Sequence, residues 1–458
     1  FKNQSAKHTD LLSTITMPSG GTVAIAYQSS GKYKDLNGNL LNTQLPFAVQ
    51  TVRSITTTDP VASVVGTSSY TYSGGVYYYA TPSDRKFAGF EKVSESRPDG
   101  SVVVNYYHQG NGTNNSNYEY NDSVGKIGYV YRTDIVNSSG TIQARSTTKY
   151  NSINTVTGAY YVYPIQTVDE MNGKNTATTY IYDTTTGNLS SSLEYGKVVV
   201  TDPLTFTDAG LDIKSTEYTY ATDASSTTYK VSSKATYDQV GTKVNETKYY
   251  YDMLVFGSLA VGNNTKVSQL KTGSTFIDSV QKTYNSYGHI TSSTDARNKT
   301  TQLGYDTNNL YIATVTNPLL QVMRYVYEYN TGKPTEVIDQ NGFTYRTSYD
   351  GLGRVLSETI PDAYGTSVTK TLYTYTDIPN AVSVQKTDYL NDQNGVETYQ
   401  YFDGLNRLVQ ERKEAEVAGT FNVRDIRYNN IALVESESLP YVATGAGKTS
   451  PTKNAALY

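Results

Sequence analysis

A tyrosine followed by a turn rich in Asp, Asn and Gly recurs through the second half of the chain. This repeat limits the possible folds more than any other feature. Clear copies lie at 283–288, 304–306, 327–332, 348–354 and 399–407. Successive copies are mostly about 20 to 26 residues apart, a period typical of repeat architectures in which each unit packs on its neighbours. The sequence therefore predicts a scaffold built by repetition.

Each unit of the repeat contains two predicted strands and two predicted turns. In the clearest unit, the turn 285–288 precedes the strand 289–294, and the turn 295–298 precedes the strand 300–305. The segment 335–349 repeats the order of strand, turn and strand. A single hairpin cannot bury its own face, so neighbouring units must pair into a continuous sheet.

Almost every other segment is also typical of a short strand. The segments 176–182 and 230–237 are rich in β-branched and aromatic residues, which favour strands. Asx-Gly pairs, which favour tight hairpins, lie at 37–38, 99–100, 172–173, 341–342 and 394–395. No window has helical periodicity. We therefore expect an all-β fold, a spiral of short antiparallel strands and hairpins.

The regularity of the repeat divides the chain into four predicted regions. Residues 1–130 contain longer strands around Gly20-Gly21 and Gly74-Gly75, residues 131–280 contain irregular repeats, and residues 281–415 contain the regular ones. Residues 416–458 are expected to add a further strand, followed by a loop or tail at 445–451.

Composition excludes several classes of function. The chain has 38 basic and 42 acidic residues with no basic run, which argues against a nucleic-acid partner. It has 45 tyrosines and no cysteine, so no disulfide or thiolate metal site is expected. No apolar stretch reaches the 18 or so residues of a membrane span. The chain starts at Phe1 without a signal-like apolar segment, so we expect a mature or excised piece of a longer protein.

The sequence contains no catalytic or metal-binding motif. The three histidines, His8, His108 and His289, are far apart and have no metal-ligand spacing. A Gly-x-Ser-x-Gly nucleophile motif is missing. We therefore predict no catalytic, cofactor-binding or metal-binding residue and no cofactor, and we expect the protein not to be an enzyme.

Weaker motifs have simpler explanations. The triplet 447–449 ends like a phosphate-binding loop, but Val442 stands where its first glycine belongs. The turn 391–395 lacks the first and last carboxylates of a calcium loop. The acidic pairs 414–416 and 435–437 are typical of solvated charge. A pair of carboxylates for glycoside hydrolysis remains an open alternative, because their separation depends on the fold.

The Tyr-Asp…Gly-Arg steps at 349–354 and 401–407 resemble the YD repeats of the Rhs family. This family includes bacterial polymorphic toxins, the B and C components of Tc toxin complexes, and animal teneurins. Further stretches are similar to the region after the β-propeller, and to shell segments, of Tc B components and SpvB-like proteins: 10–15, 45–52, 86–93 and 428–441.

The resemblance implies a YD-repeat β-shell segment, part of a hollow shell that encloses a C-terminal toxin or effector polypeptide. It also implies other shell or toxin-complex components as partners, and a secreted or cell-surface location. The chain departs from the family pattern, because it lacks the Asp-Pro-x-Gly core that ends an Rhs shell and the propeller that docks the translocation channel. The alternative functions are a cell-surface adhesion or carbohydrate-binding scaffold, since tyrosines on a β-surface can stack on glycans, and an enzyme with an unrecognised carboxylate site.

Overall fold

The computed structural model describes residues 11–112, 114–156, 159–390, 394–450 and 455–457. These residues form strands and two short 3-10 helices, η1 (Ser30–Lys32) and η2 (Val124–Lys126). The strands of the first half are β1 (Thr14–Thr16), β2 (Thr22–Ser29), β3 (Gln50–Asp59), β4 (Val64–Thr81), β5 (Asp84–Ser96), β6 (Val102–Tyr107), β7 (Val130–Val136), β8 (Ile142–Val156), β9 (Ala159–Met171), β10 (Lys174–Tyr182), β11 (Leu189–Tyr195), β12 (Val198–Asp202), β13 (Thr205–Asp208), β14 (Lys214–Thr222) and β15 (Tyr229–Tyr237). Those of the second half are β16 (Lys243–Tyr251), β17 (Asn264–Thr272), β18 (Thr275–Tyr284), β19 (Ile290–Asp295), β20 (Thr300–Tyr305), β21 (Ile312–Thr316), β22 (Val322–Glu328), β23 (Lys333–Ile338), β24 (Thr344–Tyr349), β25 (Val355–Pro361), β26 (Ser367–Thr376), β27 (Ser383–Tyr389), β28 (Gly395–Phe402), β29 (Leu408–Glu414), β30 (Thr420–Tyr428), β31 (Val434–Ser438), β32 (Tyr441–Thr444) and β33 (Ala455–Leu457).

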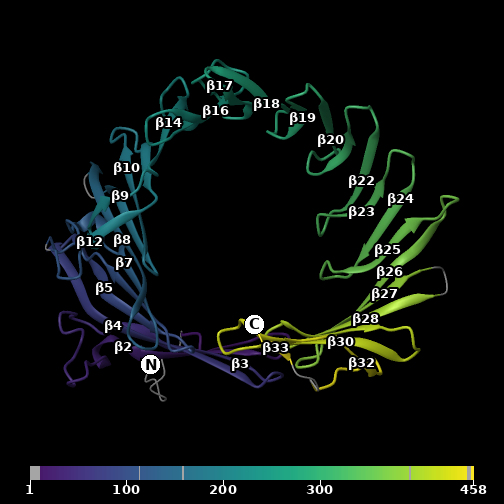
Figure 1. Ribbon diagram of the computed structural model, residues 1–458, viewed down its shortest axis with the longest axis horizontal. Coiled ribbons are helices and arrows are strands. Elements are labelled where there is room, and N and C mark those ends of the chain that lie inside the picture. The colour runs from purple at the N-terminus through teal and green to yellow at the C-terminus, as the bar shows by residue number, and fades with distance from the viewer. Residues whose placement is uncertain (1–10, 113, 157–158, 391–393, 451–454, 458) are drawn as a thin grey trace.

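Antiparallel pairing of neighbours in the sequence builds one long ladder. Each strand from β1 to β11 pairs with the next, β11 pairs with β14, and the ladder continues strand by strand to β30. The hairpin of β12 and β13 forms a separate small sheet. Figure 1 shows the ladder bending into a ring around a central opening, so that the first strands lie beside the last ones. The predicted all-β spiral of short antiparallel strands is confirmed.

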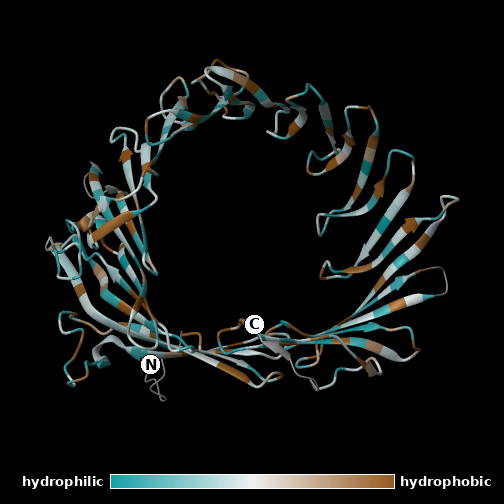
Figure 2. Ribbon diagram, viewed as in Figure 1, coloured by the Kyte–Doolittle hydropathy of each residue, from teal (hydrophilic) through white to brown (hydrophobic). Residues whose placement is uncertain are grey.

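The wall has small local clusters of buried residues in place of one central core. Val104, Tyr106 and Tyr131 form one cluster on β6 and β7. Two others lie farther along the ladder, and they contain Val168, Ala177, Val198, Ala221, Tyr251 and Leu259. Figure 2 shows hydrophobic and hydrophilic residues alternating around the whole ring. Because the described residues form no large core to hold the strands, contacts between consecutive strands must carry most of the stability.

The turns are more varied than the Asx-Gly pairs suggest. Asn172 and Gly173, both with positive φ, form the predicted two-residue hairpin between β9 and β10. At Asp339 the turn is longer: its Oδ1 accepts the N–H groups of Asn341 and Phe343, and Gly342 supplies the positive φ. An aspartate that bonds the backbone two and four residues later favours this wider turn.

Two sequence predictions are wrong: a long strand around Gly20-Gly21, and a tight Asx-Gly turn at 394–395. Gly20 and Gly21 lie in the turn between β1 and β2, since Gly20 donates to the carbonyl of Met17, whereas the long strand β4 does contain Gly74 and Gly75. Gly395 begins β28 without a positive φ, and residues 391–393 of that turn lie outside the described residues.

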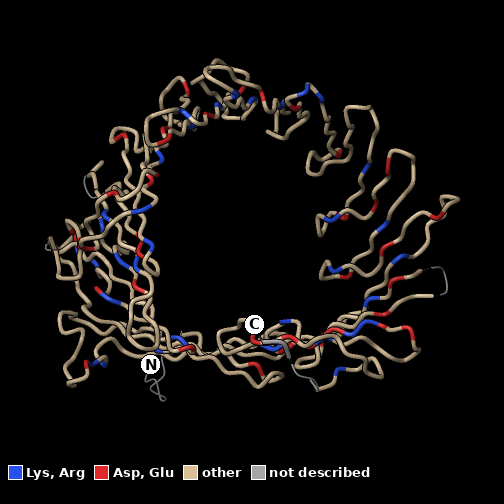
Figure 3. Tube along the Cα trace, viewed as in Figure 1, with Lys and Arg blue, Asp and Glu red and all other residues tan. Residues whose placement is uncertain are grey.

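The predicted division into four regions stays a prediction. Its boundaries at 130 and 280 fall in β7 and β18, which continue the same ladder, and the boundary at 415 follows β29. Residues 445–450 have no regular secondary structure, as expected for a loop. Figure 3 shows that basic and acidic residues alternate around the ring. The described part of the chain contains no helix that could cross a membrane.

Candidate functional site: the repeated turn and the ring seam

A carboxylate or an Asn side chain anchors the turn of each YD unit, and it does so by accepting backbone N–H groups of that turn: Asn285, Asp306, Glu328, Asp350 and Asp403. Asp350 Oδ1 accepts the backbone N–H groups of Leu352 at 2.9 Å and Arg354 at 2.8 Å, and Gly353 has a φ of 75°. The bond from the Arg354 backbone holds the pKa of the Asp350 carboxyl below its usual value. Asp350 therefore stabilises the turn, because its carboxylate accepts backbone N–H groups that face no neighbouring strand.

The repeated tyrosine bonds back to the backbone of an earlier part of the ladder. Its hydroxyl donates to a backbone carbonyl 15 or 20 positions earlier, at distances of 2.7 to 3.1 Å. Six tyrosines share this geometry, with these acceptors: Tyr251 to Val231, Tyr284 to Asn264, Tyr305 to Ile290, Tyr349 to Pro334, Tyr375 to Val355 and Tyr428 to Leu408. A tyrosine suits this position since its ring packs on the sheet while its hydroxyl finds an acceptor.

Arg354 links its own turn to the end of a later strand. Its Nε donates to Asp350 Oδ2 at 2.7 Å, and its two terminal nitrogens donate to the carboxylate of Asp377 at 2.7 and 2.8 Å. The guanidinium also lies 4.1 Å from the ring centre of Tyr375. The planar fork of arginine suits such bidentate pairing and stacking.

Arg407 repeats this arrangement at the last YD turn, with one difference. Its Nε donates to Asp403 Oδ2 at 2.7 Å, and its guanidinium lies 4.3 Å from the ring centre of Tyr428. Its second carboxylate, however, belongs to Asp59 at the end of β3, where Nη2 and Oδ2 lie 3.4 Å apart. Asp59 also accepts the Gly404 N–H at 2.9 Å. An aspartate from the first strands thus takes the position that Asp377 has for Arg354.

The contact between the first and last strands is named the seam. It consists of residues 19–21, 59–60, 380, 403–407 and 430. Gly21 N–H and Ser19 Oγ both donate to the carbonyl of Gly404, at 2.7 and 2.5 Å. The carbonyl of Ser19 accepts the N–H of Asn380 at 2.8 Å. Among the described strands no ladder pairs the first strands with the last, so turns and side chains alone close the ring.

Glycines allow the two sides of the seam to approach closely. A Cβ on Gly21 would lie 2.2 Å from the carbonyl oxygen of Gly404, and a Cβ on Gly404 would lie 2.8 Å from Pro60. Asp59 and Asp403 are fully buried there. Burial, together with the negative charge of Asp59, raises the pKa of the Asp403 carboxyl, against the bonds from Arg407.

Two stretches of the chain match models of known protein families. Residues 2–111 match a family model of the middle/N-terminal region of the insecticide toxin TcdB, and residues 257–394 match a model of the teneurin YD-shell. The predicted resemblance to Tc-type YD-repeat shells is confirmed. No curated protein matches the chain.

Solved Tc toxin structures share the fold of this chain. The crystal structure of TcdB2-TccC3 matches with a TM-score of 0.74 at 11% identity, over 94% of this chain and 31% of that one. The Photorhabdus luminescens Tc holotoxin pore matches with a TM-score of 0.73 at 10% identity, over 94% and 33% of the two chains. The chain therefore spans about a third of the length of these structures, and the likeness concerns the fold.

A polar cavity of about 590 Å³ adjoins the seam of the ring. Asp425 lines it, but Gln410 Nε2 and the Tyr441 hydroxyl donate to its two oxygens at 2.6 and 2.8 Å. Lys448 also lines it, and burial lowers the pKa of its ammonium. Since Asp425 is occupied by structural bonds, it is not arranged as a general base for a bound substrate.

Several residues of the weaker sequence motifs make contacts within the wall of the ring. Thr449 is bonded to Gln410 and Arg412, so the triplet 447–449 packs against β29. Glu414 Oε2 accepts the N–H of Glu397, and Glu437 pairs with Arg424. Both glutamates contact a neighbouring strand, whereas the sequence predicted solvated charge for these acidic pairs. The predicted absence of catalytic, cofactor and metal residues stays a prediction.

The two histidines that the structure describes lie in different parts of the ring. His289 precedes β19 and packs against Tyr287 and Tyr305, whereas His108 follows β6 and is fully buried. His8 lies outside the described residues. The sequence did not point to the neighbours of His108, which are Glu119 and Asp122 in the loop after it. Their only signal was the high density of Asn, Glu and Asp between positions 111 and 122.

Proposed function

We propose that the chain is a non-catalytic wall segment of a Tc-type shell that encloses a polypeptide. The observation that carries the proposal is the ring of paired strands, closed around a central opening by the seam. A wall of this kind needs stable strand contacts and hydrated faces, and no catalytic centre. The turns, the tyrosine bonds and the arginine links supply those contacts.

The proposed partners follow from the same architecture. One solved relative is described as TcdB2-TccC3 without its hypervariable C-terminal region. For this chain we infer an enclosed C-terminal toxin or effector polypeptide, together with other shell components that complete the wall. Such an assembly operates after secretion, outside the producing cell or at its surface.

Protection from a protease tests the enclosure. A specific protease site and then a polypeptide of toxin size are fused after residue 458. This position is chosen because β33 lies toward the central opening in Figure 1. The control places the same site in the exposed turn between Asn172 and Gly173. Enclosure predicts cleavage behind residue 458 at least about tenfold slower than in the turn.

Equal cleavage rates at the two sites would contradict the proposal that this chain encloses a polypeptide. Opening the seam with Asp59→Ala should abolish the difference in a true enclosure, because the fused segment then becomes accessible. The adhesion alternative is tested separately on a glycan panel. Binding that is lost when the exposed Tyr287 and Tyr364 are changed to Ala would favour it over the shell.

A further inference from the structure

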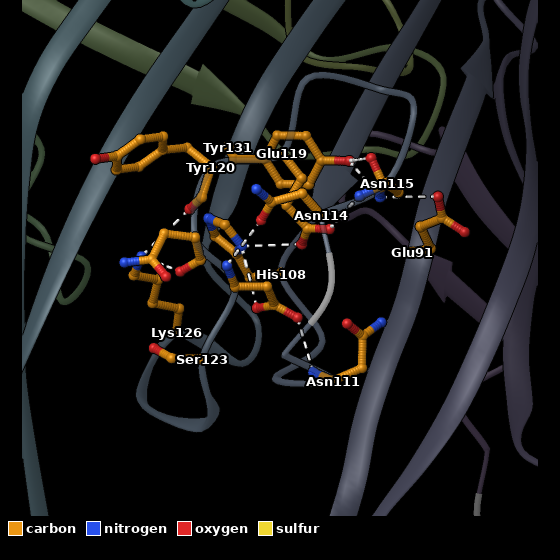
Figure 4. Close-up of polar contacts among 12 residues, drawn as sticks. Glu91, His108, Asn111, Asn114, Asn115, Glu119, Tyr120, Ser123, Lys126 and Tyr131 are labelled. Atoms are coloured by element: carbon orange, nitrogen blue, oxygen red, sulfur yellow. Dashed lines mark hydrogen bonds and ion pairs between the residues drawn. The ribbon is translucent and has the colours of Figure 1, made fainter.

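The loop between β6 and β7 brings His108, Glu119 and Asp122 into one buried cluster. Figure 4 shows His108 and Glu119 with the loop residues around them. The side chains are 0%, 2% and 0% exposed, and one ligand-type atom from each lies within 4.8 Å of the others. Burying two carboxylates is costly unless positive charge or hydrogen-bond donors meet their oxygens. The cluster therefore requires a positive charge or hydrogen-bond donors at the carboxylate oxygens of Glu119 and Asp122.

One nitrogen of His108 faces both acids. Nδ1 lies 2.9 Å from Glu119 Oε1 and 3.2 Å from Asp122 Oδ1. Nδ1 carries at most one hydrogen, and its alignment favours Glu119. Asp122 Oδ1 is buried and receives no aligned hydrogen bond from the described residues. A carboxylate oxygen therefore points into the cluster without a donor.

The loop backbone fixes the orientation of both carboxylates. Asp122 Oδ2 accepts the N–H of Asn111 at 2.8 Å, and Glu119 Oε2 accepts the N–H of Asn115 at 3.3 Å. These bonds turn Oδ1 and Oε1 toward the imidazole. Outer contacts of this kind orient ligands in metal sites. One imidazole nitrogen and two carboxylate oxygens form a suitable donor set for a divalent transition metal.

Lys126 lies beside the cluster without filling it. Its buried ammonium donates to the carbonyls of Tyr120 at 3.3 Å and Asn121 at 2.5 Å. No described carboxylate forms an ion pair with it. With one ammonium beside two carboxylates, one negative charge remains to be offset.

A proton on His108 would offset that charge but not complete the contacts. Nδ1 would still carry a single hydrogen, so Asp122 Oδ1 would remain without a donor. A metal ion between the three atoms contacts all of them at once. The geometry of the cluster therefore favours an ion over a proton.

We propose that His108 Nδ1, Glu119 Oε1 and Asp122 Oδ1 bind a divalent transition metal such as Zn²⁺ or Mn²⁺. The ion fastens the segment with Glu119 and Asp122 to His108, which directly follows β6, as structural metal sites do. This departs from the expectation drawn from histidine spacing, because two of the three ligands are carboxylates. The proposal is independent of whether the ring encloses a polypeptide.

Metal retention by the purified, tag-free chain tests the proposal. The protein is stripped with a chelator and then equilibrated separately with Zn²⁺, Mn²⁺ and Ca²⁺, and its metal content is measured after gel filtration. We expect about one Zn²⁺ or Mn²⁺ per chain, with weaker retention of Ca²⁺, which prefers more oxygen ligands. Asp122→Asn should lower the affinity at least about 100-fold.

The control variant is Glu91→Gln. Glu91 Oε1 accepts the side-chain amides of Asn115 and Asn117 and so anchors the same loop from outside the cluster. This variant should retain the metal as the unchanged chain does. No retention of Zn²⁺ and Mn²⁺ by the unchanged chain would overturn the proposal, and so would equal retention by Asp122→Asn.

A second readout covers the case in which Asp122→Asn does not fold. Co²⁺ bound to the unchanged chain should give visible d–d absorption from a site with few ligands, and Glu119→Gln should shift or abolish this band. Without any such band on the folded, unchanged chain, His108 would be the protonated partner of the two acids and the proposal would be wrong.

Discussion

Arg407 forms an ion pair with Asp59, which lies 348 positions earlier in the chain. Within the regular repeats, the equivalent Arg354 finds its second carboxylate only 23 positions away, at Asp377. Arg407 of the last repeat thus pairs with an aspartate from the first strands, whereas Arg354 pairs with an aspartate from a later strand of the regular repeats. The ring is closed by the same chemistry that joins its units.

Asp59→Ala should destabilise the protein far more than Asp377→Ala. Asp59 is fully buried, and its loss leaves the Gly404 N–H without an acceptor and removes one of the two carboxylates that meet Arg407, at a cost of about 3–5 kcal/mol. The side chain of Asp377 is 56% exposed, so the matched change should cost about 1 kcal/mol or less. Urea unfolding of the two variants measures the difference. Similar midpoints would mean that the seam contributes no more than an ordinary repeat contact.

Gly404→Ala and Gly351→Ala form a second matched pair, since both glycines follow the aspartate of a YD turn. A Cβ on Gly404 would lie 2.8 Å from Pro60, and overpacking of this kind costs about 1–3 kcal/mol. A Cβ on Gly351 would meet nothing within 4 Å, so that change should be neutral or slightly stabilising. Thermal unfolding midpoints check the contrast, and a fall in both variants would contradict it.

Tyr284→Phe should cost about 0.5–1.5 kcal/mol, because it removes the hydrogen bond from the hydroxyl to Asn264 while keeping the ring. Tyr364 is 94% exposed, so Tyr364→Phe should change stability little. Hydrogen exchange of the Ile290–Asp295 strand provides a local measurement. Faster exchange in both variants alike would show that the hydroxyl bond does not hold neighbouring units together.

Asp134 should make the protein sensitive to acid. Burial alone would raise the pKa of its carboxyl, but Arg132 and Arg145 hold that pKa below the usual 3.8. A lowered pKa contributes stability that is present above the unfolded-state value and is lost as the pH falls through the folded-state value. Stability should therefore decrease below about pH 4.

Asp134→Asn tests the acid dependence. The variant should be less stable at neutral pH, because two partly buried arginines lose their partner, and its stability should change less between pH 4 and pH 2. Unfolding free energies at several pH values measure both effects. An unchanged slope would assign the acid sensitivity to other carboxyls.

The sequence predicted local structure well because the repeat is a local pattern. The strand predicted at 300–305 has those bounds, and the strand predicted at 289–294 is shifted by one residue. Turn chemistry was predicted less well, since an Asp that bonds the backbone two and four residues later favours a wider turn than an Asx-Gly pair implies. The tyrosine bonds follow from the ladder register, which the repeat specifies only approximately.

Contacts between distant residues could not be predicted. Nothing near Asp59 in the sequence indicates that it meets Arg407, because that contact depends on how far the whole ladder bends. The cluster at His108 depends likewise on how one loop folds back between positions 111 and 122. Histidine spacing could not reveal it, since Glu119 and Asp122 resemble the many acidic residues in other turns.

The seam has no strand ladder, and this has a mechanical consequence. The ring can open at the seam without breaking the hydrogen bonds between neighbouring strands. The work of opening is then set by a few side chains and close backbone contacts, and it does not grow with the number of repeats. A ring of this design can have a strong wall and still a small, separately adjustable resistance to opening.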